Sequence, residues 1–204
     1  MELSYAAVLK SLQIYQDRVA NTLSLFTPDE REKENEVIAS FYQFLKATPD
    51  AFSRDNRLGH LTGSAFVVDT KGERLVLTHH AKLRKWIQLG GHVDSETELH
   101  KVALREAQEE SGLSQLELLL PNAEPLDFSI HEVPANRGFP AHLHYDVSYA
   151  IIARDETLVC SQESLELRWF LIRDAYKICG PEMHLRLRKL EYRLAEWTRK
   201  AAAP

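Results

Sequence analysis

The spacing of apolar residues is helical at both ends of the chain and strand-like between them. Apolar residues recur at helical intervals over residues 3–25, which predicts one or two helices. Another helix is predicted from Pro28 to about Ala47. Thr27 precedes it as a cap, proline suits its first position, and Pro49 follows its end.

Beyond Gly59 the pattern becomes typical of strands, with short apolar runs separated by turn residues. The predicted strands are residues 60–68, 74–79, 86–89, 116–120, 126–133, 141–153 and 165–171. Two helices are predicted after them, at residues 173–178 and about 182–200, the second opened by Pro181. Strands around a central helix, with helices at both ends, predict an α/β sandwich enclosing a mixed sheet.

The chain is therefore divided into a helical extension, residues 1–57, and a main domain, residues 58–204. We expect the extension to pack on the main domain or on a second subunit. The alternative is a lid that contributes to substrate choice.

The central helix lies in the stretch from Gly90 to Leu113, GGHVDSETELHKVALREAQEESGL. Ser95 and Glu98 match a capping box, which predicts a helix start near residues 96–98. Gly112 stands where a helix C-terminal glycine belongs.

Three acidic residues lie on one face of this helix, because positions i, i+3 and i+4 are neighbours on a helix. They are Glu106, Glu109 and Glu110. Their mutual repulsion is relieved by a hard divalent cation that prefers oxygen ligands, either Mg²⁺ or Mn²⁺. The stripe therefore predicts a metal site rather than a plain solvated surface.

This stretch resembles the Nudix box. The family pattern is Gly, five residues, Glu, seven residues, then Arg-Glu-apolar-any-Glu-Glu-any-Gly-apolar. The matching residues are Gly91, Arg105, Glu106, Ala107, Glu109, Glu110, Gly112 and Leu113. One position departs, because Thr97 stands where the family has its first glutamate, between Glu96 and Glu98. The departure concerns how residues around the metal ligands are arranged, and not the resemblance to the family.

The resemblance implies an α/β/α sandwich and a metal-dependent hydrolase. The expected substrate is a nucleoside diphosphate linked to another moiety. Glu106 and Glu110 are the implied principal ligands, with the Gly91 carbonyl as a further ligand. Glu109 is implied as a ligand or an acid–base group, and Arg105 as a structural residue.

A further carboxylate from a later loop is common in the family. Glu163 and Glu166 both precede the strand at 165–171, and Glu163 is preferred as a ligand or base because its segment is looser. The alternative for either residue is a solvated loop charge.

A second polar constellation is expected near the cleft. His142, His144 and Asp146 alternate along a predicted strand and therefore share one face. They are assigned to substrate binding, with His131 and the box loop near them, and direct contact with a metal is also open because His/Asp clusters suit metals. The alternative is a hydrogen-bonded sheet face with no ligand. Arg137, in the preceding loop, is a candidate phosphate contact.

Composition limits the class of protein. The chain has 204 residues, a net charge of -5 and a pI near 6.0, which argues against a nucleic-acid-coating protein. Its two cysteines, Cys160 and Cys179, have no metal-like spacing and suit a reducing compartment. No signal peptide or membrane-length apolar run is apparent, so a cytoplasmic protein is expected. The oligomeric state stays open, and the resemblance adds a homodimer as one option because dimers are frequent in the Nudix family.

Two other functions stay open. A Nudix-fold module that binds a nucleotide without hydrolysing it is favoured by Thr97. Isomerase chemistry on an isoprenoid diphosphate needs a placed cysteine, and neither Cys160 nor Cys179 lies in such a motif. The complete set of three glutamates favours catalysis.

Overall fold

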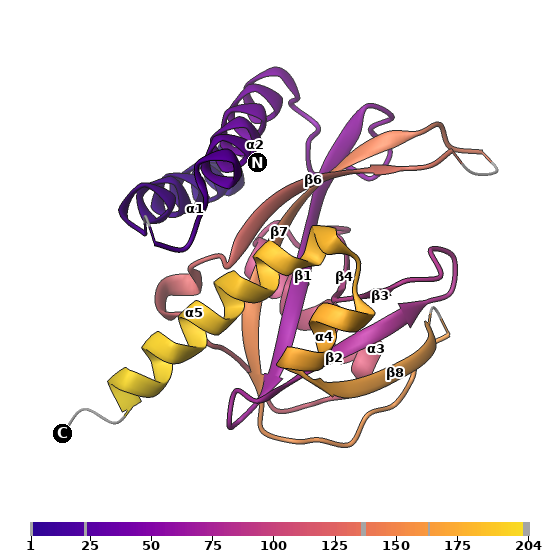
Figure 1. The fold of residues 1–204 in the computed structure, drawn as a ribbon. Helices are drawn as coiled ribbons and strands as arrows, with labels where there is room; N and C mark the ends of the chain where they lie inside the picture. The colour runs from indigo at the N-terminus through magenta and orange to yellow at the C-terminus, as the bar shows by residue number, and fades with distance from the viewer. Residues whose placement is uncertain (1, 23, 136–137, 163, 202–204) are drawn as a thin grey trace.

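The computed structural model describes residues 2–22, 24–135, 138–162 and 164–201, and it places a curled mixed sheet between helices (Figure 1). The helices are α1 (Glu2–Asn21), α2 (Pro28–Ala47), α3 (Leu99–Ser111), α4 (Ile172–Ile178) and α5 (His184–Ala201), with short 3-10 turns η1 (Pro121–Ala123) and η2 (Pro181–Met183). The strands are β1 (Gly59–Asp69), β2 (Arg74–His80), β3 (Trp86–Ile87), β4 (Leu89–His92), β5 (Leu116–Leu118), β6 (Asp127–Val133), β7 (His142–Ala153) and β8 (Ser164–Leu171). The predicted α/β fold with additional N-terminal helices is confirmed.

The sheet is built around the parallel pair of β1 and β7. Among the described residues it has eight strands, in the order β3-β2-β1-β7-β5, with β4 paired to β1, β6 to β7 and β8 to β2. The pairs other than β1 with β7 are antiparallel. Every residue of β1 is buried, because helices or neighbouring strands cover both of its faces.

Two apolar clusters hold the layers together. One joins α1, α2 and α3 to the face of β1 and β7 that carries Leu61, Ala65, Val147 and Tyr149. The other joins α4 and α5 to the opposite face, through residues such as Phe66. In Figure 1 α4 and α5 lie in front of the sheet and α3 lies behind it.

The N-terminal helices pack on the main domain through aromatic rings. Phe44 stacks on Tyr145 of β7 with ring centroids 3.7 Å apart, and Phe41 meets the same ring edge-on at 5.1 Å. Both phenylalanines are buried. Residues of α2 therefore contact β7 directly, whereas the division of the chain into an extension, residues 1–57, and a main domain, residues 58–204, stays a prediction.

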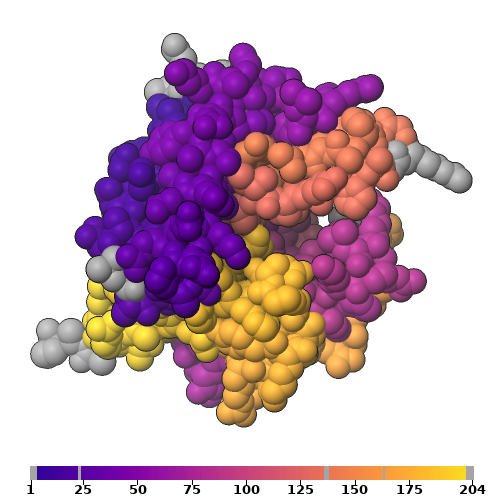
Figure 2. Space-filling view, turned by 45° about the horizontal axis from the view of Figure 1, so that its top comes forward, coloured from indigo at the N-terminus to yellow at the C-terminus, as the bar shows by residue number. Residues whose placement is uncertain are grey.

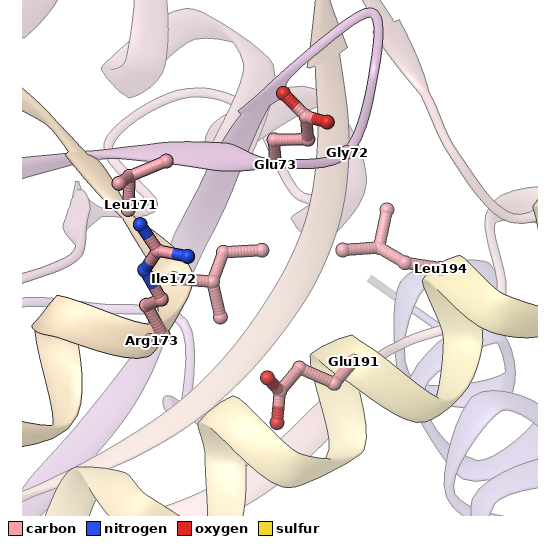
Figure 3. A pocket seen from close by; sticks show the side chains of 7 residues that line it. All are labelled: Gly72, Glu73, Leu171, Ile172, Arg173, Glu191 and Leu194. Atoms are coloured by element: carbon pink, nitrogen blue, oxygen red, sulfur yellow. The ribbon is translucent and has the colours of Figure 1, made fainter.

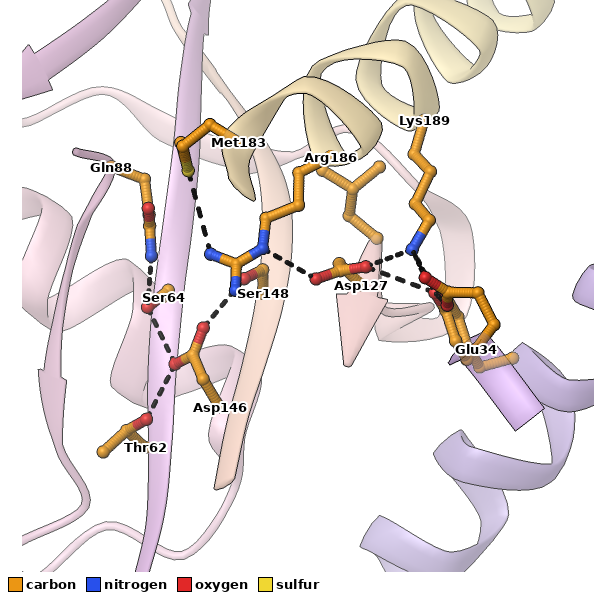
Figure 4. Close-up of polar contacts among 12 residues, drawn as sticks. Glu34, Thr62, Ser64, Gln88, Asp127, Asp146, Ser148, Met183, Arg186 and Lys189 are labelled. Atoms are coloured by element: carbon orange, nitrogen blue, oxygen red, sulfur yellow. Dashed lines mark hydrogen bonds and ion pairs between the residues drawn. The ribbon is translucent and has the colours of Figure 1, made fainter. Parts of the chain in front are cut away.

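A buried polar network adds a second connection between these helices and the rest of the chain (Figure 4). Lys189 of α5 contacts Glu34 of α2 at 2.7 Å and also contacts Asp127 of β6. Tyr15 of α1 donates to Glu34, and Arg186 lies 3.2 Å from Asp127. Two acids and two bases offset one another, so the charges are buried as a balanced set.

Most elements lie where the sequence pattern predicts them to within a few residues, and three predictions need correction. α2 has the predicted Thr27 cap, and Glu30 completes a capping box. The prediction for α3 was wrong, because the helix begins at Leu99 and Ser95 forms no capping box. Glu98 is the N-cap without a side-chain cap, and Glu96 accepts its N–H over 2.9 Å.

The other two differences lie in short segments. The strand predicted at residues 86–89 is split at Gln88 into β3 and β4. The last helix begins at His184, because Pro181 opens the separate turn η2. Among the described residues no helix is long and apolar enough to cross a membrane.

Candidate active site and histidine cluster

Helix α3, which carries the three glutamates, and strand β4, which carries Gly90 and Gly91, lie very close together. A Cβ atom added to Gly91 would lie 2.6 Å from Oε2 of Glu106, so only glycine leaves room for that carboxylate. On the neighbouring residue, the Gly90 N–H points at Oε2 of Glu110 over 3.4 Å. Gly63 of β1 allows α3 to approach, since a Cβ there would lie 2.9 Å from the Leu99 carbonyl oxygen.

The three glutamates of α3 differ in exposure. Glu110 is 8% exposed, and the Glu106 side chain is 12% exposed. Glu109 is 57% exposed and pairs with Arg105 at 3.0 Å. Burial raises the pKa of the Glu106 carboxyl above its ordinary value, although Arg105 opposes the change. Two carboxylates are therefore held against the glycine turn, and the third lies at its edge.

Arg105 connects this helix to the loop. Its Nη2 donates to the carbonyl oxygen of His92 over 2.7 Å and lies 2.8 Å from Glu106. Asp94 is 3.6 Å from the same nitrogen. Arginine presents its donors in a fixed planar fork, which suits several acceptors arranged in this way.

Two further box positions are defined by local contacts. Gly112 ends α3 in the left-handed conformation with φ of 71°, as a C-terminal glycine does. Thr97, at the position of the missing glutamate, accepts a hydrogen bond from Ser4 of α1 over 2.8 Å. The departing position is thus tied to the N-terminal extension.

The donors around the glycine turn fit a hard divalent cation. They are the two buried carboxylates and the backbone carbonyl oxygens of the turn, all of them oxygen atoms. Because Gly91 has no Cβ, the Glu106 carboxylate can lie directly against the backbone at this position.

A ladder of polar pairs runs along the other face of β1 and β7. The parallel register pairs His60 with His144, Thr62 with Asp146, and Ser64 with Ser148. All six side chains therefore lie on one face, as alternation requires. Thr62, Ser64 and Ser148 donate to the Asp146 carboxylate over 2.7, 2.8 and 3.0 Å (Figure 4).

Histidines gather at one end of this ladder. The predicted pair His142 and His144 meets His60 of β1, with ring centroids 5.0 and 4.8 Å from His60. His92 of β4 and His131 of β6 complete the group, at 5.1 and 5.4 Å from the His144 ring. Burial and the neighbouring imidazoles lower the pKa of His144 to about 2. Burial, with Arg54 nearby, lowers that of His92 to about 4.

Sequence reasoning missed His60, Thr62 and Ser64. Their signal was present, because they alternate with Leu61 and Ala65 in an otherwise apolar strand. Without the β1–β7 register, nothing placed them beside His144 and Asp146.

Two predicted site residues, Glu163 and Arg137, lie outside the described residues. The other loop acid, Glu166, pairs with Arg168 on β8. Of the two cysteines, Cys160 is exposed and Cys179 is buried in the core, where burial raises its pKa to about 11.

A pocket of about 460 Å³ lies at the opposite end of β1 from the histidines (Figure 3). Its apolar floor is formed by Leu171, Ile172 and Leu194, and charged groups such as Glu191 and Arg173 lie around it. It is separate from the box. In Figure 2 a hollow separates the orange segment of β6 and β7 from the magenta segment.

A glycine-supported carboxylate helix against a mixed sheet is the arrangement of Nudix hydrolases. The NUDIX domain model matches residues 60–197, so the chain belongs to the Nudix family. A search of curated proteins found no match.

This chain is similar to several solved structures. A NUDIX-family hydrolase from Clostridium perfringens is 23% identical with a TM-score of 0.53, over 67% of this chain and 98% of that one. An Ap4A hydrolase from C. elegans, in a binary complex, is 20% identical with a TM-score of 0.48, over 67% and 98%. The Nudix hydrolase RenU from M. smegmatis is 20% identical with a TM-score of 0.40, over 72% and 89%.

Proposed function

We propose that this chain is a metal-dependent hydrolase of nucleoside diphosphates linked to another moiety. Water is the nucleophile, and a phosphoanhydride bond is cleaved. The observation that carries the proposal is the position of Glu106 and Glu110, buried against the Gly90–Gly91 turn. Carboxylate oxygens grouped in this way are the ligands that a hard divalent cation prefers.

Glu106, Glu110 and the Gly91 carbonyl oxygen hold Mg²⁺ (or Mn²⁺) in this proposal. When bound, the ion polarises phosphate oxygens and acidifies water. The Gly90 N–H donates to the Glu110 carboxylate over 3.4 Å. Arg105 fixes the loop through the His92 carbonyl and keeps Glu106 oriented.

Glu109 is assigned as a further ligand or as an acid–base group. Its side chain is exposed, and Arg105 restrains its position. Glu163 stays a candidate base, and Arg137 a candidate phosphate contact. Gly112 has a structural role, since it ends the helix that carries the acids.

His142, His144 and Asp146 are proposed to line the substrate side of the sheet. Asp146 is 1% exposed and accepts three hydroxyl groups, so it acts by ordering Thr62, Ser64 and Ser148. Substrate contact is then made by the two histidines rather than by Asp146.

The experiment is a panel of nucleoside triphosphates, sugar nucleotides, dinucleoside polyphosphates and dinucleotide cofactors, incubated with Mg²⁺ in ¹⁸O-labelled water. We expect hydrolysis of at least one diphosphate-linked nucleotide, with the label in a phosphate product. Binding of a nucleotide without any turnover across the panel would contradict the proposal and support a non-catalytic binding module.

A further inference from the structure

The histidine cluster lies on the opposite side of β4 from the glutamates. Gly91 faces Glu106, and the next residue, His92, points to the other face, as consecutive strand residues do. The ligating nitrogens of His60, His92 and His144 all lie within 4.8 Å of one another. Three strands, β1, β4 and β7, each supply one of them.

The protonation pattern of His60 leaves a lone pair facing the cluster. Its Nδ1 lies 3.5 Å from the Asn56 carbonyl oxygen, which accepts only if Nδ1 carries the proton. Nε2 then carries the lone pair. This side chain is 1% exposed, and its Nε2 is buried with no hydrogen-bond partner among the described residues.

A second ring nitrogen of the cluster also lacks a hydrogen-bond partner among the described residues. Nε2 of His144 is also buried without a partner within the described part of the chain. The adjoining His142 has Nδ1 2.9 Å from the Pro140 carbonyl oxygen, so its Nε2 carries the lone pair as well. Metal-bound histidines typically donate their other ring N–H to a carbonyl in this way.

The Nε2 atoms of His60 and His142 favour a metal over a phosphate group. A phosphate oxygen needs a donor, and an unprotonated Nε2 can only accept. A metal ion takes the lone pair directly. Because imidazole suits Zn²⁺, Co²⁺ and Ni²⁺ whereas Mg²⁺ prefers oxygen, the donor set also separates this cluster from the carboxylates.

We propose that His60, His92 and His144 bind one divalent transition-metal ion of the zinc class, at a site separate from the glutamates. Tetrahedral coordination places nitrogens about 3.4 Å apart for bonds of about 2.1 Å, so the rings close in slightly on binding. His142 or a water molecule takes the fourth position. The histidine site shares no side chain with the glutamate site, so the inference does not rest on the proposed hydrolase activity. It assigns His144 to the ion in place of the substrate contact proposed above.

The test uses the full chain without a histidine tag, stripped of metal by a chelator and held in excess Mg²⁺. Co²⁺ alone is then titrated and followed by visible absorption. We expect one equivalent to bind with the strong absorption of low-coordinate Co²⁺ with nitrogen ligands, and Zn²⁺ to displace it. Weak absorption typical of six oxygen ligands, or no binding, would overturn the proposal.

Single variants locate the ion. His60→Gln, His92→Gln and His144→Gln should each weaken Co²⁺ binding by more than the roughly 10- to 100-fold that loss of an outer partner costs. His79→Gln, a histidine outside the cluster, and Glu110→Gln should leave it unchanged. Thermal unfolding checks each variant, and the partly exposed His92 serves if the buried His60 variant does not fold. Unchanged binding in His92→Gln and His144→Gln, or loss in Glu110→Gln, would refute the assignment.

Discussion

Arg105 donates from Nη2 to the carbonyl oxygen of His92 over 2.7 Å, which joins the box helix to the strand that carries the glycine turn. The same nitrogen lies 2.8 Å from Glu106. The Arg105 guanidinium therefore positions both the loop and Glu106, a proposed metal ligand. The ring of His92 faces the histidine cluster. Strand β4 therefore contributes Gly91 to the candidate Mg²⁺ site and His92 to the candidate histidine site.

Replacing Arg105 by lysine is expected to weaken Mg²⁺ binding by about tenfold, because a point charge cannot reach the loop and both glutamates together. Isothermal titration with Mg²⁺ measures the change. Arg154→Lys is the matched control, since it alters an exposed pair with Glu117. Equal Mg²⁺ affinity in the two variants would show that Arg105 does not position the ligands.

Gly91→Ala is expected to disturb metal binding more than stability. Its Cβ would lie 2.6 Å from the Glu106 carboxylate, which must move, and we expect the Mg²⁺ affinity to fall by about tenfold or more. Gly63→Ala instead places its Cβ against the Leu99 carbonyl and Val102 in the core, so it should lower the unfolding temperature. Mg²⁺ titration and thermal unfolding of both variants separate the effects. A Gly91→Ala protein that binds Mg²⁺ normally would contradict the site.

Lys189→Met is expected to lower the free energy of unfolding by about 3–5 kcal/mol, because Glu34 and Asp127 lose a buried counter-charge. Urea unfolding measures the change. Lys33→Met, at an exposed position of α2, should change it by no more than about 0.5 kcal/mol. A similar loss of unfolding free energy in both variants would mean that the network does not hold the N-terminal helices against the main domain.

Local signals were sufficient for much of the fold. Thr27, Pro28 and Glu30 specify the start of α2 through contacts within one helical turn, and the structure has that capping box. The start of α3 was misplaced because Ser95 and Glu98 also match the pattern. There the extended backbone of Glu98 begins the helix without a side-chain cap.

Only part of the candidate site could be predicted from the sequence. Helical spacing put Glu106, Glu109 and Glu110 on one stripe, but it did not show which of them faces the glycine turn. That depends on how α3 packs against β1 and β4. The meeting of His60 with His144 depends on a parallel strand pairing between distant segments, which no local pattern encodes.

Mg²⁺-dependent turnover of the best diphosphate substrate by Glu110→Gln tests the central claim most directly. The buried carboxylate accepts from Gly90 and is replaced by a neutral group of the same shape. We predict a fall in kcat of at least about a hundredfold, together with weaker Mg²⁺ binding and an unchanged fold by circular dichroism. The exposed Glu117→Gln control should keep full activity. Hydrolysis at the wild-type rate by Glu110→Gln would contradict the account.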